Sequence, residues 1–231
     1  MLSIKKSSAV LALGVSLTLG LAACGSNDPA TVGSSTTTSS APSAAPSPVA
    51  ALDSLTGKQT AVTLDPAFLK GITDLKLTPG VIGGAKLDAA TGKISFPITG
   101  GNVTYFDPKS GVTPFVTGEI EHAKSGLSLT GGGKKVELTD FVVDPGESML
   151  TGKVTVDGKT AFESAPLFFL DGSTVNPLDT TSQPGFAVLE GTTVSLSKEA
   201  AEALNGVFGV KALSEFFKVG IAEITLALPK S

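Results

Sequence analysis

Short apolar runs rich in β-branched residues, separated by polar and turn-forming residues, recur along most of the chain. Runs of this length and composition predict β-strands. Shorter strands are expected up to Leu64, before the first helix, and over residues 79–85. The main strands are expected over residues 93–98, 116–121, 127–129, 134–143, 150–156, 165–170, 186–196 and 220–228.

Clusters of glycine with polar residues lie between these runs, as in "TGGGKK", "DPGES", "VDGKT" and "LDGST". Such clusters are typical of tight turns. The stretches "SGLSLTGGGKKVEL" and "LTGKVTVDGKTAF" each place a turn between two apolar runs, which predicts a β-hairpin. Many short strands with glycine-rich turns favour an antiparallel sandwich or barrel.

Two segments have helical signals instead. Asp65 can cap a helix that starts with Pro66 and ends near Leu75. Ser197 can cap a second helix that runs to about Leu204, and residues 210–218 are expected to add a further helical piece. The predicted fold class is therefore mainly β, an antiparallel sandwich or barrel with two short helical segments.

The N-terminal residues have the pattern of a secretory signal. Lys5 and Lys6 precede an almost wholly apolar stretch over residues 9–22, which is too short for a comfortable bilayer crossing. The sequence "LAAC", ending at Cys24, then resembles the lipobox of bacterial lipoproteins. That resemblance implies cleavage before Cys24, a diacylglyceryl group on its sulfur, and an extracytoplasmic protein held on a membrane by its lipid.

Composition divides the chain into three parts: a signal peptide over residues 1–23, a tether over residues 24–52 and a globular domain over residues 53–231. The tether is dominated by Ser, Thr, Pro and Ala, so we expect it to be disordered. Cys24 is the only cysteine, and lipidation would leave no thiol for catalysis, metal binding or a disulfide.

Charge and residue usage narrow the function classes. The net charge is −4, all 17 basic residues are lysines, and Arg and Trp are absent. An acidic domain without arginine is a poor nucleic-acid binder, so no nucleic-acid partner is expected. No strong catalytic motif occurs, and the single histidine would have to serve any Ser-His-Asp triad. We therefore do not expect an enzyme.

One constellation carries specific chemistry, because Tyr105 and His122 are the only residues of their kinds. A phenolate can ligate ferric haem iron, and a nearby imidazole can ligate the iron or hydrogen-bond to the phenolate. "GEIEH" over 118–122, with "GLSL" over 126–129, resembles a stretch of the haem-transport-associated domains of Gram-positive cell surfaces. In that family a tyrosine binds iron and a histidine supports it. The tyrosine lies well upstream of the histidine there, whereas Tyr105 is close to His122, so the iron ligand stays open.

Three interpretations follow. The first is a non-catalytic lipoprotein whose β-rich domain binds a ligand, an envelope protein or an envelope polymer, or serves as a structural element, without a cofactor. The second is haem or metal capture through Tyr105 and His122. The third, more remote, is a hydrolase that uses carboxylates alone. Glu119 and Glu121 would lie on one face of a strand, about 7 Å apart by strand rise, and are its candidate pair.

Overall fold

Twelve strands hydrogen-bond into one antiparallel sheet in the part of the chain that the computed structural model describes, residues 46–55 and 57–228. The strand order is β1-β6-β7-β8-β9-β10-β11-β12-β2-β5-β4, and β3 pairs with β7 beside this path. The bounds are β1 Ala50–Leu52, β2 Gly57–Leu64, β3 Thr78–Gly83, β4 Lys86–Asp88, β5 Lys93–Pro97, β6 Gly100–Tyr105, β7 Val116–Gly131, β8 Lys134–Asp144, β9 Met149–Val156, β10 Lys159–Asp171, β11 Phe186–Leu196 and β12 Lys218–Ala227.

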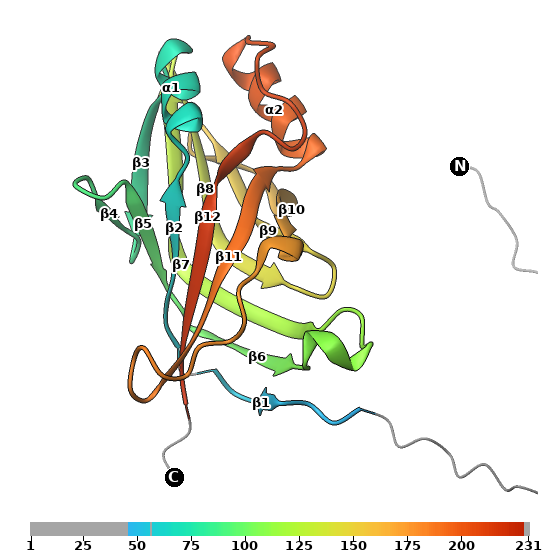
Figure 1. The fold of residues 1–231 in the computed structure, drawn as a ribbon. Helices are drawn as coiled ribbons and strands as arrows, with labels where there is room; N and C mark the ends of the chain where they lie inside the picture. The colour runs from blue at the N-terminus through green and yellow to red at the C-terminus, as the bar shows by residue number, and fades with distance from the viewer. Residues whose placement is uncertain (1–45, 56, 229–231) are drawn as a thin grey trace, which may run out of the picture. The chain divides into compact units, whose positions relative to one another are not determined.

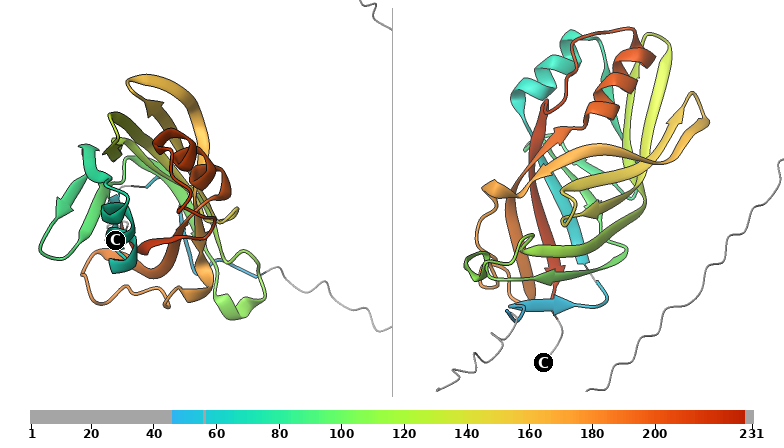
Figure 2. Two further views of the ribbon diagram at one scale, coloured as in Figure 1. Left: turned by 90° about the horizontal axis from the view of Figure 1, so that it is seen from above. Right: turned by 90° about the vertical axis from the view of Figure 1, so that its right-hand side faces the viewer.

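The sheet curls on itself into a half-barrel, as the two views of Figure 2 show. The first part of the long strand β7 pairs with β6 and its last part pairs with β3. Thr99, just after β5, donates its backbone N–H to the carbonyl of Glu121 on β7 at 2.8 Å. The β5 side of the sheet therefore returns to β7, and the inner faces of the strands enclose a common interior.

Two α-helices lie near one end of the curled sheet (Figure 1). Helix α1 (Pro66–Asp74) begins after Asp65, whose carboxylate accepts the N–H of Ala67, with Pro66 in the first turn. Helix α2 (Lys198–Phe208) begins after Ser197, whose hydroxyl accepts the N–H of Ala200. Two short 3₁₀ turns, η1 (Pro108–Ser110) and η2 (Gly172–Thr174), lie in connections between strands.

The predicted fold class is confirmed: the domain is mainly β and antiparallel, with two helices. Both predicted hairpins are present, because Gly131 pairs with Lys134 and Val156 pairs with Lys159 across their turns. The predicted caps Asp65 and Ser197 also hold.

One helical prediction is wrong, since residues 210–217 form a loop before β12 and not a helical piece. Gly209 ends α2 in the left-handed conformation, with φ of 66°. The Asn205 side chain then clamps the loop by accepting the N–H of Leu213 and donating to its carbonyl. Leu213, which belongs to this loop, is buried. A side-chain clamp and a buried leucine thus replace the helical hydrogen bonds.

The N-terminal boundary of the domain also differs from the prediction. Residues 50–52, assigned to the tether, form β1 and pair with β6, where Ala50 lies opposite Tyr105. Backbone pairing supplies order that composition alone does not indicate. The predicted signal peptide, Cys24 and residues 25–45 of the tether lie outside the described residues.

A compact unit spans Ala44–Ser231 and has its own hydrophobic core. A complete sheet with its own core is the property of a domain that folds independently, so a fragment over this range is suitable for experiments. No helix among the described residues is both long and apolar enough to cross a bilayer.

Candidate functional site: an apolar cavity inside the sheet

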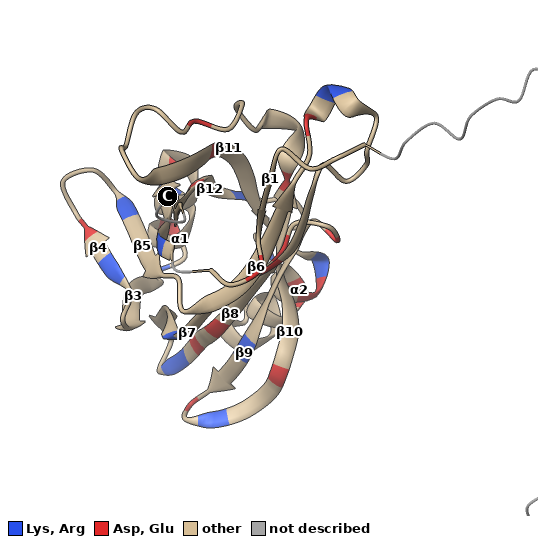
Figure 3. Cartoon of the chain, turned by 90° about the horizontal axis from the view of Figure 1, so that it is seen from below, with Lys and Arg blue, Asp and Glu red and all other residues tan. Residues whose placement is uncertain are grey.

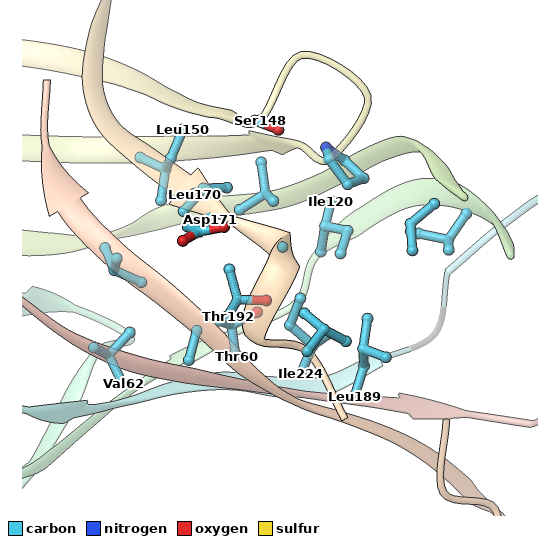
Figure 4. A pocket seen from close by; sticks show the side chains of 18 of the residues that line it. Thr60, Val62, Ile120, Ser148, Leu150, Leu170, Asp171, Leu189, Thr192 and Ile224 are labelled. Carbon is cyan, nitrogen blue, oxygen red and sulfur yellow. The ribbon is translucent and has the colours of Figure 1, made fainter. Parts of the chain in front are cut away.

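A cavity of about 370 Å³ lies inside the curled sheet. This volume is within the range of small-molecule sites in proteins. Its wall comes from the inward-facing residues of ten strands, and aliphatic and aromatic side chains dominate it. Figure 4 shows Val62, Ile120, Leu150, Leu189 and Ile224 converging on this space from different strands. Several widely separated segments therefore build one apolar site.

The alternation of β7 decides which of its residues reach the cavity. Val116, Ile120 and His122 are buried and line the cavity, whereas Glu119 and Glu121 are exposed between them. The two carboxylates of the predicted hydrolase pair therefore share the outer face of the sheet, away from the cavity. Glu121 lies opposite Gly100 of β6, and neither glutamate lines the cavity.

His122 stands at the start of a bulge in β7. The register with β8 passes from His122–Phe141 to Gly126–Thr139, so three residues of β7 oppose one of β8. Side chains hold this bulge: Asp140 accepts the N–H of Lys124 at 2.8 Å, and the Ser125 hydroxyl donates to the His122 carbonyl at 3.0 Å. His122 is thereby fixed with its ring turned inward, and its residue is only 2% exposed.

The His122 ring makes one hydrogen bond, between Nε2 and the hydroxyl of Thr60 on β2 at 2.8 Å. Strands β2 and β7 are not neighbours in the sheet, so this bond crosses the interior. Phe96 packs edge-on to the ring, with centroids 6.3 Å apart. Nδ1 has no hydrogen-bond partner among the described residues. A buried polar atom left in this state costs about 1–3 kcal/mol.

Burial lowers the pKa of His122 to about 4. The nearby backbone of Phe141 and Ile120 acts in the opposite direction and raises the pKa, but by less than burial lowers it. The charged imidazolium is disfavoured where water cannot solvate it. His122 is therefore a neutral imidazole at physiological pH. A neutral imidazole can accept a hydrogen bond or ligate a metal.

Tyr105 lines the same cavity but lies far from His122 along the sheet. It ends β6 opposite Val116, and its ring packs edge-on against Phe115 at 6.1 Å between centroids. Val116 precedes His122 on β7 by about 20 Å, at about 3.3 Å of rise per residue. The two residues singled out by the sequence thus share a cavity without meeting in it.

The cavity reaches solvent between the connections that contain η1 and η2, where the lining residues Thr113, Pro114 and Ser173 are exposed. Asp171 lies at this side, at the end of β10. Its carboxylate accepts the N–H of Ser173 at 2.9 Å. Hydrogen bonds from Ser173 lower its pKa, so the group is ionised at neutral pH.

Within the described residues, no group of three or more His, Cys, Asp or Glu side chains is arranged to hold a metal ion. A metal bound in the cavity through protein side chains would have to rely on fewer ligands than this.

Comparisons with known proteins show what this fold is similar to. No protein-family model and no curated protein matches the chain. Among solved structures, the C-terminal domain of HtaA from Corynebacterium glutamicum aligns with a TM-score of 0.52 and 14% identity, over 78% of this chain and 99% of that domain. The N-terminal domain of the same HtaA aligns with a TM-score of 0.46 and 14% identity, over 75% of this chain and 99% of that domain. At this identity, the likeness to the C-terminal domain shows a shared fold and nothing finer.

Two residues of the site were missed by sequence reasoning, namely Thr60 and Asp171. Thr60 carries a weak signal, because Thr60, Val62 and Leu64 alternate along β2 and all face the cavity. Asp171 belongs to "LDGST", which predicts only a turn. Its position at the cavity follows from the course of β10 across the sheet.

Proposed function

We propose that this chain is a non-catalytic binding protein of the bacterial cell envelope, which holds a small apolar ligand in the cavity inside its sheet. The observation that carries this proposal is the cavity itself, about 370 Å³ of space walled almost wholly by apolar side chains. Protein interiors are normally packed to high density, with few voids larger than a water molecule. A cavity of this size, reaching solvent on one side, is typical of a binding site.

The proposal includes attachment to the membrane through a lipid on Cys24. The lipobox at residues 21–24 after an apolar segment supports it. Two or three acyl chains, at about 0.8 kcal/mol per buried methylene, anchor a protein firmly. Metabolic labelling with palmitate is expected to mark the wild-type chain and not a Cys24→Ala variant. Equal labelling of both would contradict the anchor.

Cavity binding can be tested with N-phenyl-naphthylamine, an uncharged fluorescent probe, on the fragment from Ala44 to Ser231. The chain has no tryptophan. A single introduced indole is therefore the only tryptophan that can transfer excitation energy to the bound probe. Leu189→Trp places the indole in the cavity, whereas Glu190→Trp places it on the exposed face of the same strand. Saturable probe binding is expected in the wild type and in Glu190→Trp, weakened about tenfold or more in Leu189→Trp. Equal binding by both variants would place the probe elsewhere.

Haem is the second candidate. It is favoured by the buried neutral His122 and by the resemblance of residues 118–122 and 126–129 to haem-transport-associated domains. The shared fold with the HtaA domain is consistent with that resemblance. When bound, haem would supply an iron centre with visible absorption. The residues present fit it through His122 alone, whose Nδ1 has no partner among the described residues. Tyr105 does not reach His122, and the upstream residue that contacts His122 is Thr60, not a tyrosine.

A haemin titration of the same fragment tests this candidate. If His122 is an iron ligand, a saturable Soret shift is expected in the wild type and in Tyr105→Phe, and is lost in His122→Ala. A far-ultraviolet circular dichroism spectrum of His122→Ala checks that the variant is folded. A flat titration of the folded wild type would remove haem as a candidate and leave cavity binding standing.

A further inference from the structure

The cavity has an uneven distribution of charge. Among the residues that line it, Asp171 is the only ionised one, and no lysine contributes. The lysine of the η1 connection, Lys109, does not line the cavity either. Figure 3 shows charged residues marked along β4, β5 and β7 to β10 and few on β1 and β11. An anionic ligand would therefore find no cation in the wall and one carboxylate at the open side.

The polar groups that do line the cavity are mainly hydroxyls. Figure 4 shows Ser148 and Thr192 on either side of Asp171, among aliphatic side chains. A hydroxyl can both donate one hydrogen bond and accept hydrogen bonds, whereas a carboxylate only accepts. The N–H and the side chain of Ser173 occupy acceptor sites of Asp171, and a carboxylate offers about four. Asp171 is thus equipped to accept hydrogen bonds from a ligand that carries donors.

We propose that the cavity selects an uncharged lipid, with its aliphatic part in the interior and a hydroxyl-bearing end at Asp171, and discriminates against anionic lipids. This inference rests on the proposed function, since it names the class of ligand for the same cavity. Two like charges near each other with no counter-charge are unfavourable, most of all where apolar walls exclude water. A hydroxyl end group meets the same carboxylate as a hydrogen-bond donor. The apolar wall therefore selects the aliphatic part of the ligand, and Asp171 at the open side selects an uncharged end.

The test uses displacement of N-phenyl-naphthylamine from the Ala44–Ser231 fragment at neutral pH. Three competitors share one acyl chain: monododecanoylglycerol, methyl dodecanoate and dodecanoate. Monododecanoylglycerol is expected to displace the probe at a concentration about tenfold below that needed for dodecanoate. Methyl dodecanoate, uncharged but without a hydroxyl end, is expected between the two.

Asp171→Asn removes the charge and keeps the size of the side chain, so dodecanoate should then compete within about threefold of monododecanoylglycerol. Asp107→Asn is a matched control. Asp107 begins η1 as Asp171 begins η2, accepts the N–H of Lys109 at 2.8 Å, and does not line the cavity. This control should keep the wild-type order of competitors.

Each result decides something. Equal competition by dodecanoate and monododecanoylglycerol, or a preference unchanged in Asp171→Asn, overturns the selection for uncharged lipid and leaves cavity binding intact. A haemin Soret shift that depends on His122 overturns it as well, because haem is a dianion through its propionates. Failure of the wild type to bind the probe at all overturns both the inference and the proposed function.

Discussion

The cavity has two polar regions that differ in kind, one around His122 and one around Asp171. His122 is buried, makes a single side-chain hydrogen bond to Thr60, and has its pKa lowered to about 4 by burial. Asp171 is partly exposed and has its pKa lowered by hydrogen bonds from Ser173. The same direction of shift has opposite meanings. His122 is kept neutral, and Asp171 is kept charged.

This difference shows how an apolar cavity can carry specificity. A polar group deep in the wall must be neutral because a charge there would lack solvation. A charge is tolerated at the open side, where water still reaches it. The interior then favours the apolar part of a ligand, and the open side discriminates between ligands by their charge. The four predictions below test this division by altering one region at a time.

The largest effect is expected from Gly126→Ala, which attacks the bulge that holds His122. A Cβ at this position would lie 2.0 Å from the carbonyl oxygen of Leu138 and 2.9 Å from the Cα of Thr139. Both are backbone atoms in a paired strand, so the sheet itself must shift. We expect the free energy of unfolding to fall by about 3 kcal/mol, measured by urea denaturation.

Gly206→Ala in α2 is the matched control for this substitution. A Cβ there meets nothing within 4 Å, and alanine is the better helix former by about 1 kcal/mol. Gly206→Ala should therefore be neutral or slightly stabilising. A loss of stability in this control equal to that of Gly126→Ala would contradict the steric explanation.

The second effect is a loss of stability in mild acid that depends on His122. Its pKa is about 4 in the folded protein against 6.5 for an unperturbed histidine, so the unfolded chain binds the proton more tightly. Stability should be constant above pH 6.5, fall as the pH drops toward about 4, and then receive no further loss from this group. The shift corresponds to about 3 kcal/mol in total.

Urea denaturation at several pH values between 7.5 and 4 measures this slope. His122→Ala should be less stable at neutral pH and lack the slope between pH 7.5 and about 5. Carboxylates with lowered pKa values, such as Asp171, begin to lose their stabilising contribution at about pH 5, as the unfolded chain takes up protons around the ordinary pKa of 3.8. The slope between pH 7.5 and about 5 is therefore the part that distinguishes His122. An identical slope in His122→Ala would mean that His122 is not the group responsible.

A smaller effect is expected from Thr60→Val, which keeps the shape of the side chain and removes its hydroxyl. His122 would then lose the partner of Nε2, at a cost of about 1–2 kcal/mol in the free energy of unfolding. Thr192→Val lies on the same cavity wall, and the Thr192 hydroxyl has no side-chain partner in the described part of the chain, so this variant should change stability by less than about 0.5 kcal/mol. Similar losses in both variants would show that the hydroxyl–imidazole bond is not the cause.

The smallest effect on stability is expected from Asp171→Asn. The side chain is partly exposed, and an amide oxygen can still accept the N–H of Ser173. We expect a change below about 0.5 kcal/mol by the same denaturation measurement. A large loss would mean that Asp171 is structural, and its effect on ligand preference would then need a second variant, Asp171→Ser, to be interpreted.

The sequence predicted the local features of this fold with good accuracy. Most strands from residue 93 onward, the hairpin turns and the caps at Asp65 and Ser197 depend on neighbouring residues, whose propensities can be read in order. Strand β6 (Gly100–Tyr105) is the exception, since it was not predicted from the sequence. Residues 210–217 were misassigned for the opposite reason: their conformation depends on Gly209 and on a clamp from Asn205. The run 116–121 and the run 127–129 were read as separate strands, although β7 continues through the bulge between them.

By itself, then, the sequence determined the class of fold and the rarity of Tyr105 and His122, and it predicted a secretory signal with Cys24 as the anchor. Only the tertiary structure decided that Tyr105 and His122 lie apart in one cavity, that Thr60 is the partner of His122, and that Asp171 is the one charge on the wall. The physical reason is the range of the interactions. Turns and caps arise between residues a few positions apart, whereas the cavity exists only once distant strands pair and the sheet curls around them.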